Sequence, residues 1–161
     1  MSEIIDFYEG KKTSCRHNLS DIWSYSFEQL EDEHDYIQWM FPLNEPSAHN
    51  NKAPILTAED IKTFRESPML RWRVMTSVHT FMRFLHFTTS AWLCEYDHNH
   101  LRITRILKCL MLFGMENEAH ALFEELTSHV KFYREYLGDP KFMSKATCYW
   151  ADALGNSLET L

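Results

Sequence analysis

Residues 68–87 read PMLRWRVMTSVHTFMRFLHF, and this stretch decides the fold class. Its inward positions advance in steps of three and four residues, the spacing that puts side chains on one face of an α-helix. These positions are Leu70, Val74, Ser77, Val78, Phe81, Phe84 and Leu85. The pattern therefore predicts a central helix with one buried face.

Similar spacing recurs on both sides of this stretch, where capping residues mark the expected ends. Ser20 or Asp21, Thr57, Asn99 and Asp139 are candidate N-caps, and glycine favours the left-handed C-cap. We expect further helices over residues 20–34, 57–67, 99–114, 119–138 and 139–154. Residues 36–47 contain two prolines, which favour a long ordered loop.

The composition agrees with an all-α fold. Of 161 residues, 45% are hydrophobic and 14% aromatic, but only four are glycine and five proline, too few for the frequent turns of a sheet protein. We predict a compact single-domain bundle of about six helices with one long aromatic and proline-rich loop. Residues 1–18 carry no sustained period and are assigned to an N-terminal arm, and residues 19–161 to the helical domain.

Charge and cysteine usage limit the environment of the chain. A formal net charge of -7 makes general attraction to nucleic acid or an anionic membrane unfavourable. No apolar run approaches the roughly 20 residues of a membrane-spanning helix, so we expect no integral membrane span, while peripheral membrane association stays open. The four cysteines form no CxxC pair and no signal-peptide pattern opens the chain, which predicts reduced thiols in the cytoplasm.

Two patterns offer an alternative function, a metal-dependent helical enzyme. His34-Asp35 is the adjacent pair used by HD-type phosphohydrolases, for which His17 and Asp97 would be the further ligands. The di-iron carboxylate alternative uses Glu and His three residues apart on one helix, as in Glu31 to His34 and in Glu95 to His98. Acidic, solvated helix ends explain the Glu-His spacing better, and an adjacent His-Asp pair often occurs by chance.

Other catalytic signals are absent from the sequence. It contains no glycine-rich phosphate loop, no nucleophile elbow and no separated CxxC pair. We therefore expect a non-catalytic protein without a cofactor or a metal.

Arg102, Arg105 and Lys108 follow one another on the side of their helix opposite Ile103 and Ile106. One interpretation is a solvated basic face. In the other, an arginine folds inward and pairs with Glu45 or another carboxylate through a charge-assisted fork.

Two segments resemble the conserved region of the opioid growth factor receptor family. Residues 34–47 read HDYIQWMFPLNEPS and residues 98–108 read HNHLRITRILK. The similarity extends from about residue 20 to the C-terminus, and the chain looks like a minimal, stand-alone version of the domain. The family's animal members are described as receptors for the pentapeptide Met-enkephalin that are associated with the nucleus and its membrane. The resemblance therefore implies peptide binding, and a nuclear or perinuclear location beside the cytoplasmic one.

We predict that a peptide or protein segment binds beside these two segments, because aromatic and arginine side chains concentrate binding energy at interfaces. The candidate ligand-binding residues are Tyr36, Gln38, Trp39, Phe41, Glu45, Asn99, Arg102 and Arg105. In an equally supported alternative, the aromatic loop only packs on the helix that carries Arg105 and the motif is structural. The sequence does not give the ligand or the oligomeric state.

Overall fold

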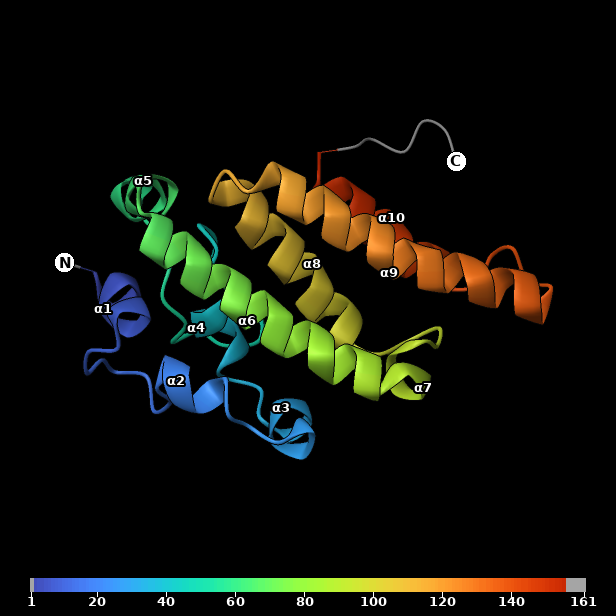
Figure 1. The fold of residues 1–161 in the computed structure, drawn as a ribbon, viewed down its shortest axis with the longest axis horizontal. Helices are drawn as coiled ribbons and strands as arrows, with labels where there is room; N and C mark the ends of the chain where they lie inside the picture. Colours follow the sequence, from blue (N-terminus) through green and yellow to red (C-terminus); the bar gives the residue numbers. More distant parts are fainter. Residues whose placement is uncertain (1, 156–161) are drawn as a thin grey trace. The chain divides into compact units, whose positions relative to one another are not determined.

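The computed structural model describes residues 2–155, without the side chains of residues 89 and 90 (Figure 1). Within that range every named regular element is an α-helix, and one isolated parallel bridge joins Leu43 and Ile55. The all-α prediction is confirmed. The chain divides into two compact units, the first reaching to Phe87 and the second beginning at Thr88.

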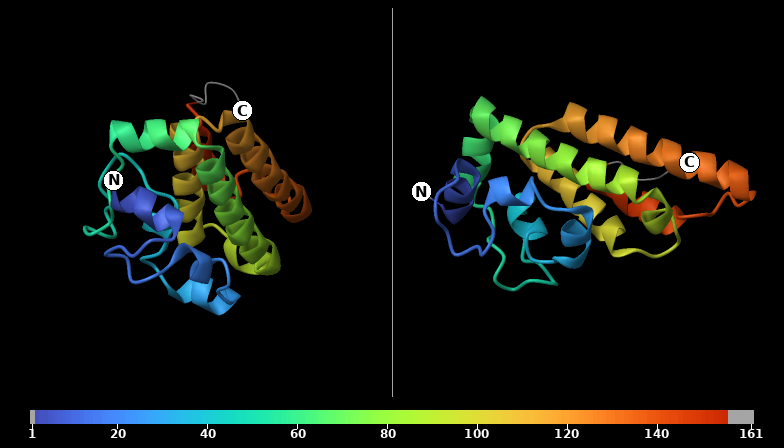
Figure 2. Two further views of the ribbon diagram at one scale, coloured as in Figure 1. Left: turned by 60° about the vertical axis from the view of Figure 1, so that its left-hand side comes forward. Right: turned by 60° about the horizontal axis from the view of Figure 1, so that its bottom comes forward.

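The first unit is organised around α6, the 20-residue helix predicted from the apolar stripe. Its buried residues include Leu70, Val74, Phe81 and Phe84, as the spacing requires. Helices α1, α3 and α5 each contact α6, and Figures 1 and 2 show α5 crossing the start of α6 and the other short helices of this unit to one side of it. The helices of this unit are α1 (Glu3–Glu9), α2 (Leu19–Ile22), α3 (Phe27–Asp32), α4 (Ile37–Met40), α5 (Ala58–Glu66) and α6 (Pro68–Phe87).

Helix α1 has no periodic apolar pattern and was not predicted. Ser2 caps it, and Ile4, Ile5, Phe7 and Tyr8 are buried. The Phe7 ring lies 5.5 Å from that of Trp39, and Tyr8 meets Phe64 edge-on at 4.9 Å. Two turns are too short for a period to be visible, so burial rather than pattern fixes this helix. The predicted boundary at residue 18 falls inside the first unit.

The prediction of one continuous helix over residues 20–34 is wrong, because the helical structure is interrupted between α2 and α3. Ser26 restarts it with a capping box: its hydroxyl accepts from the Gln29 amide at 3.2 Å, while the Gln29 side chain accepts from the Ser26 amide at 3.0 Å. The helix ends at Asp32, so His34 lies outside it.

The aromatic loop, residues 36–47, is ordered and contains one turn of helix, α4. After α4, the Leu56 amide donates to the Leu43 carbonyl at 2.9 Å. This hydrogen bond holds the segment before α5 against the aromatic loop. Every side chain from Tyr36 to Leu43 is buried, and the exposed positions begin at Asn44. The loop is thus part of the core of the first unit.

The second unit is built on mutual contacts between α8, α9 and α10. Trp92, Trp150, Phe113, Leu107 and Leu110 are fully buried in it. Its helices are α7 (Thr89–Trp92), α8 (His98–Leu112), α9 (Glu116–Leu137) and α10 (Ser144–Ala153).

The starts of two of these helices differ from prediction. Asp97 rather than Asn99 caps α8, because its carboxylate accepts from the Asn99 amide at 2.8 Å. Helix α10 begins at Ser144, five residues after Asp139, and its N-cap Met143 has a left-handed backbone with φ of 53°. Gly138 ends α9 in the left-handed region as predicted. No helix within residues 2–155 combines the length and apolar character needed to cross a membrane.

Candidate functional site

The aromatic residues predicted to contact a ligand are buried in the first unit. Tyr36 and Phe41 are fully buried and Trp39 is nearly so. The Tyr36 hydroxyl donates to the Leu30 carbonyl at 2.8 Å, so its polar atom has an internal partner. A side chain already packed on all sides has little surface left for a ligand, which favours the structural interpretation of the motif.

Two polar members of the predicted site differ in their exposure. Gln38 is buried, and with its amide turned so that the nitrogen points inward it donates to the His34 and Asp35 carbonyls at 3.1 and 3.3 Å. Glu45 is exposed. The predicted contact between Glu45 and a basic helix residue would join the two units and stays a prediction.

The predicted residues on α8 are also largely internal to the second unit. Asn99 is fully buried, and Arg102 donates from Nη1 to the Asn99 side-chain oxygen at 3.1 Å. The solvated-face interpretation is therefore wrong for Arg102, which folds inward. Arg105 and Lys108 are half-buried.

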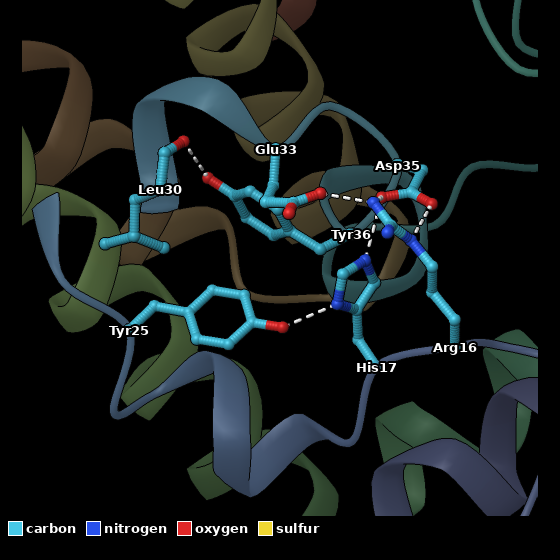
Figure 3. A network of polar contacts seen from close by, with 7 residues as sticks. All are labelled: Arg16, His17, Tyr25, Leu30, Glu33, Asp35 and Tyr36. Carbon is cyan, nitrogen blue, oxygen red and sulfur yellow. Dashed lines mark hydrogen bonds and ion pairs between the residues drawn. The ribbon is translucent and has the colours of Figure 1, made fainter. Parts of the chain in front are cut away.

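Asp35 of the family motif forms a polar network with Arg16, His17 and Glu33 in the first unit (Figure 3). The Arg16 guanidinium donates to both Asp35 oxygens, at 2.7 and 3.0 Å, and also contacts the Glu33 carboxylate. The nearly buried His17 ring bridges Asp35, at 2.8 Å, and the Tyr25 hydroxyl, at 2.5 Å. The segment before α2 is thereby tied to the start of the aromatic loop.

Charge and burial shift two pKa values in this network. Hydrogen bonds from Arg16, helped by His17, lower the pKa of the Asp35 carboxyl to about 2. Burial, followed by the nearby carboxylate Glu33, raises the pKa of the Tyr25 phenol. Asp35 is thus ionised and Tyr25 neutral at ordinary pH, which suits a structural cross-link.

The alternative of a metal-dependent enzyme finds only partial support in this geometry. His17, Glu33 and Asp35 have ligand atoms within 4.8 Å of one another, a grouping able to hold a metal ion. However, the Arg16 cation already contacts both carboxylates and supplies the positive charge that they require. His34 and Glu95 lie outside helices, so neither Glu-His pair shares the helix face on which the di-iron alternative depends.

A groove in the second unit has exposed apolar side chains that a ligand could contact, unlike the buried aromatic residues of the predicted site. It has a volume of about 520 Å³ and runs between the first turn of α8 and helix α10. Tyr96, Leu101 and Tyr149 line it with 82%, 56% and 51% of their surfaces exposed. The remaining lining residues are Glu95, Asp97, His98, His100, Lys145 and Ala146.

The floor of the groove is fixed by hydrogen bonds to the core. The His100 ring contacts the Trp92 carbonyl through Nε2 at 2.7 Å, and the Trp150 indole donates to the His100 carbonyl at 3.1 Å. Ala146 is buried beside them. A rigid, partly apolar hollow with exposed aromatic walls is the kind of site that accepts a side chain from a partner.

Sequence reasoning missed most of this groove. It named Glu95, Asp97 and His98 as possible metal ligands, placed His98 and Leu101 in the second family segment, and gave no role in binding to Tyr96, Lys145 and Tyr149. The residues come from two segments almost 50 positions apart, as in the hydrogen bond from the Met143 amide to Glu95, and no local pattern links the two. One usable signal was Tyr149, which is apolar but lies one position off the buried stripe marked by Ala146 and Trp150.

Comparison with known proteins identifies the family. The model of the opioid growth factor receptor conserved region matches residues 5–137. The opioid growth factor receptor of Rattus norvegicus is 34% identical over 113 residues, covering 59% of this chain and 19% of that protein. The human receptor is 31% identical over 115 residues, covering 59% and 16%.

A second group of relatives gives the same result. Opioid growth factor receptor-like protein 1 of Xenopus tropicalis is 34% identical over 119 residues, covering 62% of this chain and 23% of that protein. The chain thus spans less than a quarter of the length of these relatives. No solved structure matches it. Since the family model covers most of the chain, the protein belongs to the family defined by the opioid growth factor receptor conserved region.

Proposed function

We propose that the chain is a non-catalytic, receptor-like domain that binds a peptide or protein segment. The observation that carries the proposal is the groove between α8 and α10, whose walls are exposed tyrosine and leucine side chains. Tyrosine is enriched where proteins bind one another, because it offers a large and rigid contact area. The groove lining also includes His98, the first residue of the second family segment.

The relatives support the same class of function, since their name describes receptors for an opioid growth factor. In this proposal the buried aromatic loop has a structural task, and the exposed groove contacts the ligand. All four cysteines are free thiols, which fits our proposal that the chain resides in the reducing cytoplasm. Imaging of the tagged full chain tests that location.

Titration of fluorescently labelled Met-enkephalin, the peptide suggested by the family resemblance, tests the proposed function. We expect saturable binding by the wild-type chain and binding at least about fivefold weaker by Tyr149→Ala, because truncating an aromatic anchor typically costs more than 1 kcal/mol. Tyr136→Ala is the matched control, since Tyr136 is an exposed tyrosine of the same unit outside the groove lining.

The alternative outcomes are distinct. Equal binding by wild type, Tyr149→Ala and Tyr136→Ala would exclude the groove as the binding surface. Absence of binding by all three would remove this peptide as a ligand, and a panel of unrelated labelled peptides would then decide whether the chain binds peptides at all.

A further inference from the structure

We infer that the groove recognises a segment carrying an aromatic side chain next to an acidic side chain, with the carboxylate paired to Lys145. This inference rests on the proposed function and names the chemistry of the ligand. The carboxylates of Glu95 and Asp97 already have hydrogen-bond partners within the described residues of the second unit, whereas the ammonium group of Lys145 does not.

Both carboxylates of the groove accept hydrogen bonds from backbone amides at helix starts. Glu95 accepts a hydrogen bond from the Met143 backbone amide at 3.1 Å, at the start of α10. Asp97 accepts from the Asn99 amide at 2.8 Å, at the start of α8, and its second oxygen lies 3.9 Å from Nδ1 of His98. Their negative charge is therefore directed at backbone amides of the protein itself.

Lys145 has no such partner. It is exposed on the groove lining, and its ammonium group forms no hydrogen bond or ion pair within residues 2–155. It is also the only lysine or arginine among the lining residues. A ligand that complements the groove would therefore place a negative group at Lys145 and an apolar group between Tyr96 and Tyr149.

The same capping pattern indicates where the negative group of the ligand comes from. Proteins usually bind a terminal carboxylate with a set of backbone amides. Here the Asn99 and Met143 amides at the two helix starts already donate to Asp97 and Glu95. A side-chain carboxylate needs only the flexible ammonium group of Lys145, so we assign the acidic group to an internal Asp or Glu of the partner.

Three N-acetylated dipeptides, two with an amidated and one with a free C-terminus, test this inference by amide chemical-shift titration of the ¹⁵N-labelled full chain. N-acetyl-Phe-Glu-amide should bind about two- to fivefold more tightly than N-acetyl-Phe-Gln-amide, the range expected for an exposed ion pair. N-acetyl-Phe-Gln with a free C-terminal carboxylate should bind no better than the Gln amide. This probe carries the same charge as the Glu peptide, so repulsion from the net charge of -7 is matched.

Substitutions then assign the preference to one side chain. Lys145→Met should abolish the preference for Glu, so that this variant binds the Glu and Gln amides equally well. Lys131→Met, which removes an exposed lysine outside the groove lining, should retain it. In 0.5 M salt the wild-type preference should shrink, because exposed charge pairs are screened.

Two results would overturn the inference and leave the proposed function standing: equal binding of the Glu and Gln amides to wild type, or tightest binding of the free-carboxylate peptide. If none of the peptides shifted the amides of residues 95–101 and 145–149, both the inference and the proposed binding surface would fail.

Discussion

The imidazole Nε2 of His17 lies 2.8 Å from Oδ1 of Asp35, which joins two residues 18 positions apart inside the first unit. The same carboxylate accepts two hydrogen bonds from Arg16. Asp35 thus couples the segment before α2 to the family motif that leads into α4. The contribution of Asp35 to the stability of the fold is electrostatic, so it depends on pH.

The Asp35 network should stabilise the fold above pH 4 and lose that effect as the pH falls toward 2. The pKa of Asp35 is lowered from 3.8 to about 2, so the folded state favours the ionised carboxylate and loses this advantage on protonation. We expect Asp35→Asn to lower the free energy of unfolding at pH 7 by about 1 kcal/mol, a modest figure because the carboxylate is partly exposed. Urea unfolding from pH 7 to pH 2.5 measures the difference.

Asp32→Asn is the control, because Asp32 is an exposed carboxylate at the end of α3. Its effect should stay within about 0.5 kcal/mol at every pH. A deficit in Asp35→Asn that persisted unchanged down to pH 2.5 would show that the ionised form of Asp35 is not the stabilising one.

Trp39 should matter for stability far more than the exposed tyrosine of the groove. Trp39 is nearly buried and packs against Phe7, so Trp39→Ala should lower the free energy of unfolding by about 3–5 kcal/mol. Tyr149 is half-exposed, and Tyr149→Ala should cost less than about 1 kcal/mol. Urea unfolding of both variants makes the comparison, and a Trp39→Ala variant as stable as wild type would contradict the core role of the loop.

Glu95 should stabilise the second unit through a single hydrogen bond. Its carboxylate accepts from the amide of Met143, a non-glycine residue with a left-handed backbone. Removing the acceptor in Glu95→Ala should cost about 1 kcal/mol, whereas Glu95→Gln keeps an acceptor oxygen and should cost less. Thermal unfolding of the two variants tests this order, and equal losses would mean that the hydrogen bond is not the source of the effect.

The cysteines should differ in their reactivity toward a thiol reagent. Cys109 is fully buried, and burial raises the pKa of its thiol, so little thiolate is present and none is accessible. Cys148 is exposed on α10. With Ellman's reagent at pH 8, Cys148 should react first and Cys109 only on unfolding, as mass spectrometry of the products would show. Early labelling of Cys109 would contradict its position in the core.

The sequence predicted the long helices well because their cores are periodic. The stripe from Leu70 to Leu85 corresponds to α6, and Gly138 ends α9 at the expected residue. Short helices escaped prediction, since α1 and α4 have seven and four residues, too few to display a period. The interruption of the helix between α2 and α3 was not predicted, because the apolar spacing continues across Ser26. The sequence does contain the residues of a capping box, Ser26 and Gln29.

The sequence could not decide whether the aromatic residues of the candidate site pack in the core or bind a ligand, for a physical reason. Unusual composition drew attention to Tyr36, Trp39 and Phe41, but large aromatics are used for core packing as readily as for binding. Only the fold separates the two uses, by burying these three and exposing Tyr96 and Tyr149. For Arg102 the sequence left a solvated and an inward position open, and the inward position depends on the buried side chain of Asn99, to which Arg102 donates.

The position of a bound peptide distinguishes the groove from the aromatic loop most directly. It can be located from the backbone amide shifts that N-acetyl-Phe-Glu-amide, which carries the inferred aromatic and acidic side chains, induces in the ¹⁵N-labelled full chain. We predict saturable shifts concentrated in residues 95–101 and 145–149, with residues 36–45 unaffected. Saturable shifts confined to residues 36–45, with the groove residues unchanged, would contradict a binding surface between α8 and α10.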